Sequence, residues 1–149
     1  MNTGSVPGLT LSNPASEGQP AGVQSARYVR IYADERGASH FEDVSRGLAP
    51  IDFAPPAPPL NVAELTPAGR CFLFGGAADW GRGGVPHPTP RRQFCCFLRG
   101  ELDITVSDGE KRRFSPGSLL LLEDTSGAGH VSQVAGDTEF LIFGVTVTD

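Results

Sequence analysis

The stretch from Gly81 to Gly100 reads GRGGVPHPTPRRQFCCFLRG and contains the information that decides the fold. Glycine, histidine, threonine and glutamine recur in it at the spacing G-x5-H-x-T-x3-Q-x6-G. Side chains alternate across a β-strand, so Gln93, Cys95 and Phe97 share one face. The run after Pro90 therefore predicts a strand that turns this face toward a core.

Short apolar runs with turn residues between them follow this stretch and predict an all-β fold. Asp108 and Gly109 form one of these turns, because Asp-Gly favours a tight hairpin. No stretch has a clear helical apolar period, and closely spaced short strands are typical of sandwiches and barrels. The predicted strands are RYVRIYAD, CFLFGG, QFCCFL, ELDITV, KRRF, SLLLL, HVSQV and EFLIFGVTV.

The composition excludes several classes of protein. The chain of 149 residues is 39% hydrophobic and 19% charged, which is ordinary for one globular domain. Its net charge of −5 comes from interspersed charges without a basic stripe, so we expect no nucleic-acid partner. No apolar run approaches the roughly 18 residues of a membrane span, and the start lacks the pattern of a secretory signal. We expect a cytoplasmic protein without membrane contact.

Three parts of the chain differ in composition. Residues 1–26 are mostly Gly, Pro, Ser, Asn and Ala and predict a flexible tail. Residues 27–68 contain the first strand and the Pro-rich segment APIDFAPPAPPL, which predicts an extended arm packing on a barrel because proline lacks the ladder donor. Residues 69–149 contain the remaining strands and predict the barrel itself.

The spacing in the decisive stretch resembles the first motif of the cupin superfamily, G-x5-H-x-H-x3/4-E-x6-G. Gly81, His87 and Gly100 match its glycines and its first histidine. The second histidine of the motif falls on Thr89 and its glutamate falls on Gln93. Two of the four usual metal-ligand positions are therefore replaced.

The second cupin motif is matched by Gly109, Ser115, Gly117 and His130, with a longer interval before the histidine than is usual. A narrower likeness is to a subgroup of small cupins that read PRRQF, LLLED and G-x-GH in this order. The resemblance implies a double-stranded β-helix, or jelly-roll barrel, with an extended N-terminal arm. It also implies a homodimer, in which the strand of Tyr28 and Tyr32 adds to the partner's sheet edge.

The resemblance makes His87, His130 and the amide oxygen of Gln93 the candidate metal ligands. We expect one divalent transition metal, Fe, Mn, Zn or Ni, and no nucleotide or flavin. A neutral amide is a poorer ligand than a carboxylate, so affinity should be lower than in a site with glutamate. The amide of Gln93 can equally bind substrate. The alternative is a pair of hydrogen-bonded histidines that hold no ion.

His87, His130 and Asp124 are the candidate catalytic residues. A carboxylate beside a histidine orients the imidazole and raises its basicity, and imidazole titrates near neutral pH. Glu123 and Asp124 both follow the run of leucines, and either can serve. Asp124 is slightly favoured because it has the same parity as His130.

Three further side chains are candidates for substrate binding. Arg91 has the parity of the inward face and can fork onto a substrate carboxylate, although a salt bridge with Asp79 or Glu101 is an alternative. Cys95 should line the pocket as a small apolar group. Trp80 can form an apolar wall of the entrance.

We therefore expect a small-molecule cupin enzyme acting on an oxygen-bearing organic substrate in the barrel pocket. With a metal, the resemblance implies an oxygenase, decarboxylase or isomerase. Without one, His87 and His130 imply an acid–base isomerase, dehydratase or cyclase. A barrel that binds a small ligand without turnover is the alternative from another class.

Overall fold

The computed structural model describes residues 24–148, which fall into two compact units. Residues 28–44 and 66–148 form the larger unit, and residues 24–27 and 45–65 form the smaller one. The predicted arm over residues 27–68 is thus divided between the two units, because its first strand pairs with a barrel strand. Of the predicted tail, residues 1–23 lie outside the described residues.

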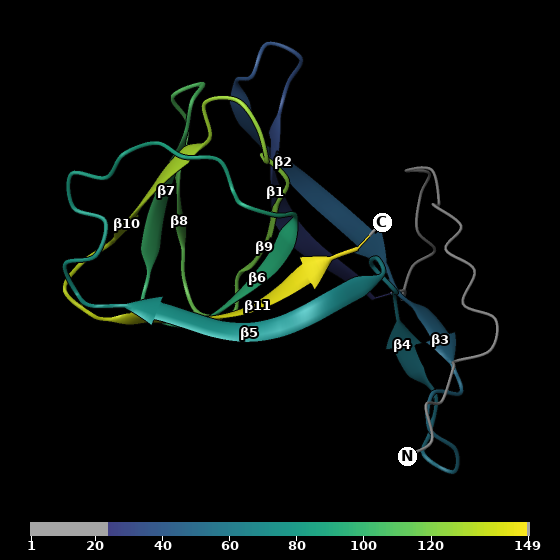
Figure 1. The fold of residues 1–149 in the computed structure, drawn as a ribbon. Coiled ribbons are helices and arrows are strands. Elements are labelled where there is room, and N and C mark those ends of the chain that lie inside the picture. Colours follow the sequence, from purple (N-terminus) through teal and green to yellow (C-terminus); the bar gives the residue numbers. More distant parts are fainter. Residues whose placement is uncertain (1–23, 149) are drawn as a thin grey trace. The chain divides into compact units, whose positions relative to one another are not determined.

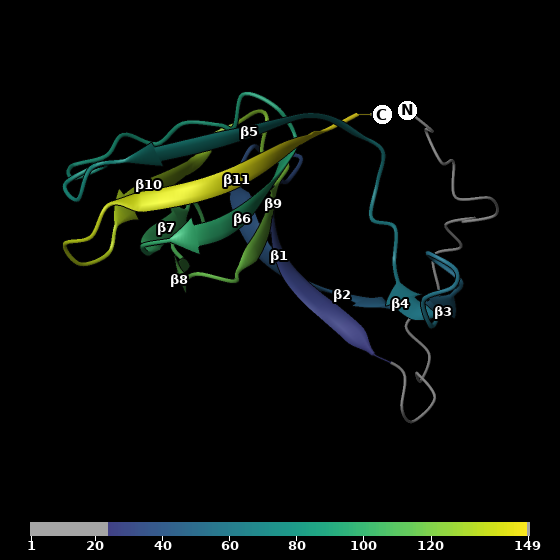
Figure 2. The ribbon, with the colours of Figure 1, turned by 90° about the horizontal axis from the view of Figure 1, so that it is seen from below.

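The strands of the larger unit belong to two facing sheets (Figures 1 and 2). The six-stranded sheet has the order β2 (Ser39–Gly47), β1 (Ser25–Ala33), β9 (Leu119–Leu122), β6 (Gln93–Arg99), β11 (Phe140–Val147), β5 (Ala68–Gly76). The three-stranded sheet has the order β10 (His130–Val134), β7 (Leu102–Val106), β8 (Lys111–Phe114). β1 runs parallel to β9. The neighbouring pairs β9–β6, β6–β11 and β11–β5 are each antiparallel.

The architecture confirms the predicted all-β jelly-roll barrel. Every predicted strand is present, and KRRF and HVSQV have the predicted limits as β8 and β10. Gly109 has a φ of 100° in the turn between β7 and β8, as the predicted hairpin requires. Among the described residues, no helix is long and apolar enough to cross a membrane.

Three strands were not predicted. β2 reads SHFEDVSRG, and its many polar residues suit the edge position that it takes beside β1. In the smaller unit, β3 (Ala49–Ile51) pairs antiparallel with β4 (Leu60–Val62). The Pro-rich segment is therefore the loop of a two-stranded sheet rather than a simple extended arm.

The core lies between the two sheets and explains the alternation seen in the sequence. Cys95 and Phe97 of β6 are 2% and 1% exposed, as the parity of this strand predicts. Phe94 lies on the opposite face and is also buried, because the ring of Tyr28 packs edge-on against it at 5.4 Å. The other members of the core cluster are Ile31, Leu102, Ile104, Val106, Phe114, Leu120, Leu122, Val134, Phe140 and Ile142.

Candidate functional site

A cavity of about 170 Å³ lies inside the barrel, between the two sheets. Most of its wall is apolar and comes from the strands that form the core. The few polar groups in this wall are therefore the groups that a bound molecule would meet. Five of the predicted site residues line the cavity, namely Trp80, His87, Gln93, Cys95 and His130.

The backbone brings His87 and His130 together. Their residues form an isolated antiparallel bridge in which each N–H donates to the other carbonyl oxygen, at 3.1 Å in both directions. The ring centroids are 5.5 Å apart. Gly129 permits this approach, because it has a φ of 71° and a Cβ at its position would collide with the His87 backbone.

A buried carboxylate lies behind His130. The Nδ1 atom of His130 is 2.6 Å from Oδ2 of Asp124, and the two residues are 4% and 0% exposed. A carboxylate oxygen accepts hydrogen bonds, so this contact favours the imidazole tautomer with its proton on Nδ1 and with Nε2 as the acceptor. The second carboxylate oxygen of Asp124, Oδ1, is buried without a hydrogen-bond partner in the described part of the chain.

The neighbouring carboxylate has a different role. Glu123 contacts Arg30 at 3.0 Å and Arg92 at 2.9 Å, away from the histidines. Successive side chains at the end of β9 point to opposite faces, so only one of the two carboxylates can reach His130. The structure places Asp124 there and answers the question that the sequence left open.

Thr89 and Gln93 form a short chain of hydrogen bonds at the same end of the cavity. The Thr89 side chain is 2% exposed, and its hydroxyl donates to the Arg91 carbonyl oxygen at 2.9 Å. The Gln93 amide nitrogen donates to the Thr89 hydroxyl oxygen at 3.3 Å. This orients Gln93 and leaves its amide oxygen without a hydrogen-bond partner within residues 24–148.

The remaining predicted residues take different places. Burial raises the pKa of the Cys95 thiol to about 12, so Cys95 is a neutral apolar lining group rather than a nucleophile. The Trp80 ring packs edge-on against Phe140, with centroids 5.2 Å apart, and forms part of the cavity wall. Arg91 does not line this cavity but a second hollow outside it, beside Gln93. Within the described residues it forms no ion pair with Asp79 or Glu101.

A family model described as EutQ-like cupin domain matches residues 76–145. The chain carries a cupin domain. The match includes β6 to β10 together with His87, Gln93, Asp124 and His130. No curated protein matches the chain significantly. The family thus agrees with the barrel and leaves the chemistry to the residues of this chain.

A cupin domain raises the question of a metal, and the donor set of this one does not fit a divalent ion. Two imidazoles and one neutral amide face the cavity, whereas catalytic ions normally have three protein ligands of stronger donor type. Asp124 adds no ligand, because it is engaged behind His130. Across residues 24–148, no three His, Cys, Asp or Glu side chains gather as a metal-binding group.

One group of lining residues was not predicted. Arg70, Phe72 and Phe74 of β5 line the second hollow together with Arg91 and Gln93. The alternation in RCFLFGG places these three residues on one face of a strand, so the pattern was present in the sequence. The local pattern does not indicate that β5 pairs with β11 and therefore lies near β6.

Proposed function

We propose that this cupin domain is a small-molecule enzyme that transfers protons without a metal. His130 is the base, Asp124 orients it, and His87 is the second acid–base group. The observation that carries the proposal is the contact of 2.6 Å between His130 Nδ1 and Asp124 Oδ2 at the wall of an apolar cavity. A histidine held in this way presents Nε2 to a molecule in the cavity.

The chemistry follows from this geometry. Nε2 of His130 takes a proton from a carbon next to a carbonyl group, and the electron pair of that C–H bond moves into the carbonyl as an enolate. His130 or His87 then returns a proton to another atom of the same molecule. The apolar wall excludes water and strengthens each polar interaction with the substrate. Isomerisation, dehydration and cyclisation all use this step.

A purely ligand-binding barrel accounts less well for Asp124. Burying a carboxylate with one oxygen unpartnered lowers stability, and a barrel that only holds a ligand gains nothing from it. Such costly groups cluster at functional sites, because a buried carboxylate positions a base. This favours turnover over binding alone.

The test measures solvent-deuterium incorporation into a panel of small enolisable oxo acids, including phenylpyruvate, by mass spectrometry or NMR. The wild-type protein should label at least one of them. His130→Gln should lower the rate about 100-fold or more, because general acid–base catalysis contributes at least that much. Asp124→Asn should lower it as well, since the amide no longer fixes the tautomer.

His40→Gln is the matched control, because His40 contacts Asp34 and Asp108 and lies outside the cavity wall. It should label at the wild-type rate. Labelling of no oxo acid, or equal labelling by wild type and His130→Gln, contradicts the proposal.

A further inference from the structure

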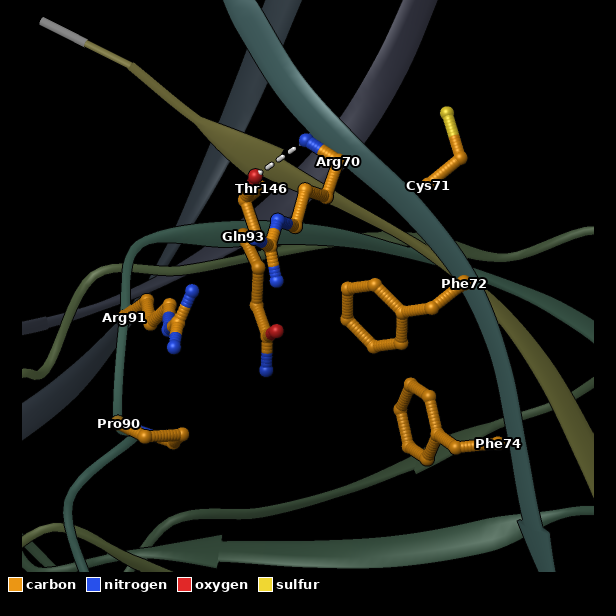
Figure 3. A pocket seen from close by; sticks show the side chains of 8 residues that line it. All are labelled: Arg70, Cys71, Phe72, Phe74, Pro90, Arg91, Gln93 and Thr146. Atoms are coloured by element: carbon orange, nitrogen blue, oxygen red, sulfur yellow. Dashed lines mark hydrogen bonds between the residues drawn. The ribbon is translucent and has the colours of Figure 1, made fainter.

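The hollow outside the cavity is larger than the cavity itself, with a volume of about 500 Å³. Phe74, Pro90 and Gln93 line both spaces, so the hollow and the cavity adjoin each other. Figure 3 shows Arg91 and Pro90 across the hollow from Phe72 and Phe74, with Gln93 between them. The hollow therefore has a charged side and an aromatic side.

Two guanidinium groups supply the charge. Arg70 comes from β5 and Arg91 from the segment before β6, and neither contacts a carboxylate anywhere in residues 24–148. Five other arginines of the chain do contact carboxylates, namely Arg30, Arg92, Arg99, Arg112 and Arg113. In a chain with a net charge of −5, two unpaired arginines at one hollow favour an anion there. A planar guanidinium matches a carboxylate in two-point geometry.

The aromatic side determines the body of the ligand. Phe72 and Phe74 stack with their ring centroids 5.6 Å apart and an interplanar angle of 28°. Both belong to the face of β5 that turns toward the hollow, and Phe74 is 36% exposed. Exposed phenyl faces next to cationic groups suit a flat apolar body that carries an acid group.

We propose that this hollow binds an aromatic carboxylate, with the acid group on Arg70 and Arg91 and the ring against Phe72 and Phe74. The inference rests on the proposed function, since Gln93 lines both the hollow and the cavity and the carbons between the acid group and the ring of the same molecule would lie beside it. It names the substrate class as small organic acids with a flat apolar body.

The experiment is calorimetric titration of the full chain with cinnamate and with its neutral amide. Cinnamate should bind, and its amide should bind about tenfold more weakly or worse, because a hydrogen-bonded charge is removed. Arg70→Gln and Arg91→Gln should each weaken cinnamate binding about tenfold. Both side chains are free of ion pairs to carboxylates within the described residues, so the variants should keep the wild-type melting temperature.

Arg36→Gln is the charge-matched control, because Arg36 lies in the turn between β1 and β2 and outside the hollow. It should leave cinnamate binding unchanged. Failure of cinnamate to bind, equal binding of acid and amide, or wild-type affinity in both arginine variants overturns the inference.

His130→Gln separates this inference from the proposed function. Binding of cinnamate by this variant should still depend on Arg70 and Arg91, because these side chains line the outer hollow and His130 lines the cavity. Arginine-dependent binding together with unchanged labelling by His130→Gln supports the anion site and overturns the proton-transfer proposal. Labelling that depends on His130 without arginine-dependent binding supports the proton-transfer proposal and overturns the anion site.

Discussion

Single residues determine how this domain differs from the usual cupin motif. The motif positions usually held by histidine and glutamate are Thr89 and Gln93, and the Gln93 amide donates a hydrogen bond to the Thr89 hydroxyl. Sequence reasoning could find the replaced positions, because spacing alone defines them. Parity favoured Asp124 over Glu123 only slightly, because the choice depends on the direction of each side chain at the end of β9.

Gln93→Glu should create a metal site where the wild type has a weak donor set. A carboxylate beside His87 and His130 supplies the missing charge, so we predict that Zn²⁺ or Ni²⁺ affinity rises about tenfold or more. Calorimetric titration with each metal measures this directly. Gln133→Glu, on β10 and away from the cavity lining, should show no such gain. Wild-type affinity equal to that of Gln93→Glu would contradict the donor-set argument.

At the scale of elements, the local sequence pattern predicted the strands and turns but not their long-range pairing. Alternation and turn residues predicted KRRF, HVSQV and the hairpin between β7 and β8. The parallel pairing of β1 with β9 joins segments about 90 residues apart and has no local signal. The bridge between His87 and His130 is a long-range contact of the same kind, which is why the site was predicted as residues and not as a geometry.

Gly129→Ala should weaken the bridge between the two histidine segments. The residue has a φ of 71°, and an added Cβ would collide with the His87 backbone. We predict a loss of about 1–3 kcal/mol in unfolding free energy, measured by chemical denaturation. Gly136→Ala is the matched control, because its φ is 84° and a Cβ there meets nothing within 4 Å. Equal losses in the two variants would contradict this, because the strain of a positive φ alone, without the collision with the His87 backbone, would then account for the loss.

His40 connects two turns and should make stability depend on pH. It lies 2.7 Å from Asp34, after β1, and 2.8 Å from Asp108, in the hairpin of β7 and β8. Hydrogen bonds to Asp34 and then to Asp108 raise the pKa of His40 above its usual value. The pKa of Asp34 is lowered chiefly by His40, and that of Asp108 chiefly by the Glu110 backbone N–H and then by His40.

The sign of the effect follows from these directions. A raised histidine pKa stabilises the fold below the ordinary value of about 6.5, and this stabilisation is lost as pH rises through the folded value. The lowered pKa values of the two aspartates stabilise the fold above a pH of about 4, and this stabilisation is lost as the pH falls through their folded-state values. We predict that the melting temperature of the wild type falls more between pH 5.5 and pH 8.5 than that of His40→Gln. Parallel pH profiles would contradict this. The three side chains are about one third exposed, so solvent screens the ion pairs and the difference should be small.

At the scale of the whole molecule, the homodimer stays a prediction, but we now expect a different surface to form it. Tyr28 is buried against Phe94 of its own chain, and β1 pairs with β9 of its own chain. This edge of β1 therefore does not need a strand from a partner. Exposed apolar side chains lie instead on three neighbouring strands of the large sheet. They are Leu73 on β5, Phe143 on β11 and Leu98 on β6, with exposed fractions of 63%, 37% and 48%.

We predict that the wild type is dimeric by light scattering at micromolar concentration and that Leu73→Glu is monomeric. Leu73 pairs with Phe143 in the register, so a charge at this position disrupts the centre of the apolar face. Val85→Glu is the matched control, because Val85 is 76% exposed in the segment between β5 and β6. A monomeric wild type, or a dimer that Leu73→Glu does not weaken, would contradict the prediction.

The central claim is that His130, oriented by Asp124, transfers protons together with His87 and without a metal. The measurement that tests it most directly is the rate of deuterium incorporation into the oxo acid that the protein labels, before and after chelation, with metal content determined by mass spectrometry. We predict the same rate in the metal-stripped protein and no gain on adding Fe²⁺, Mn²⁺, Zn²⁺ or Ni²⁺. A rate that disappears on chelation and returns with one of these ions would contradict the claim.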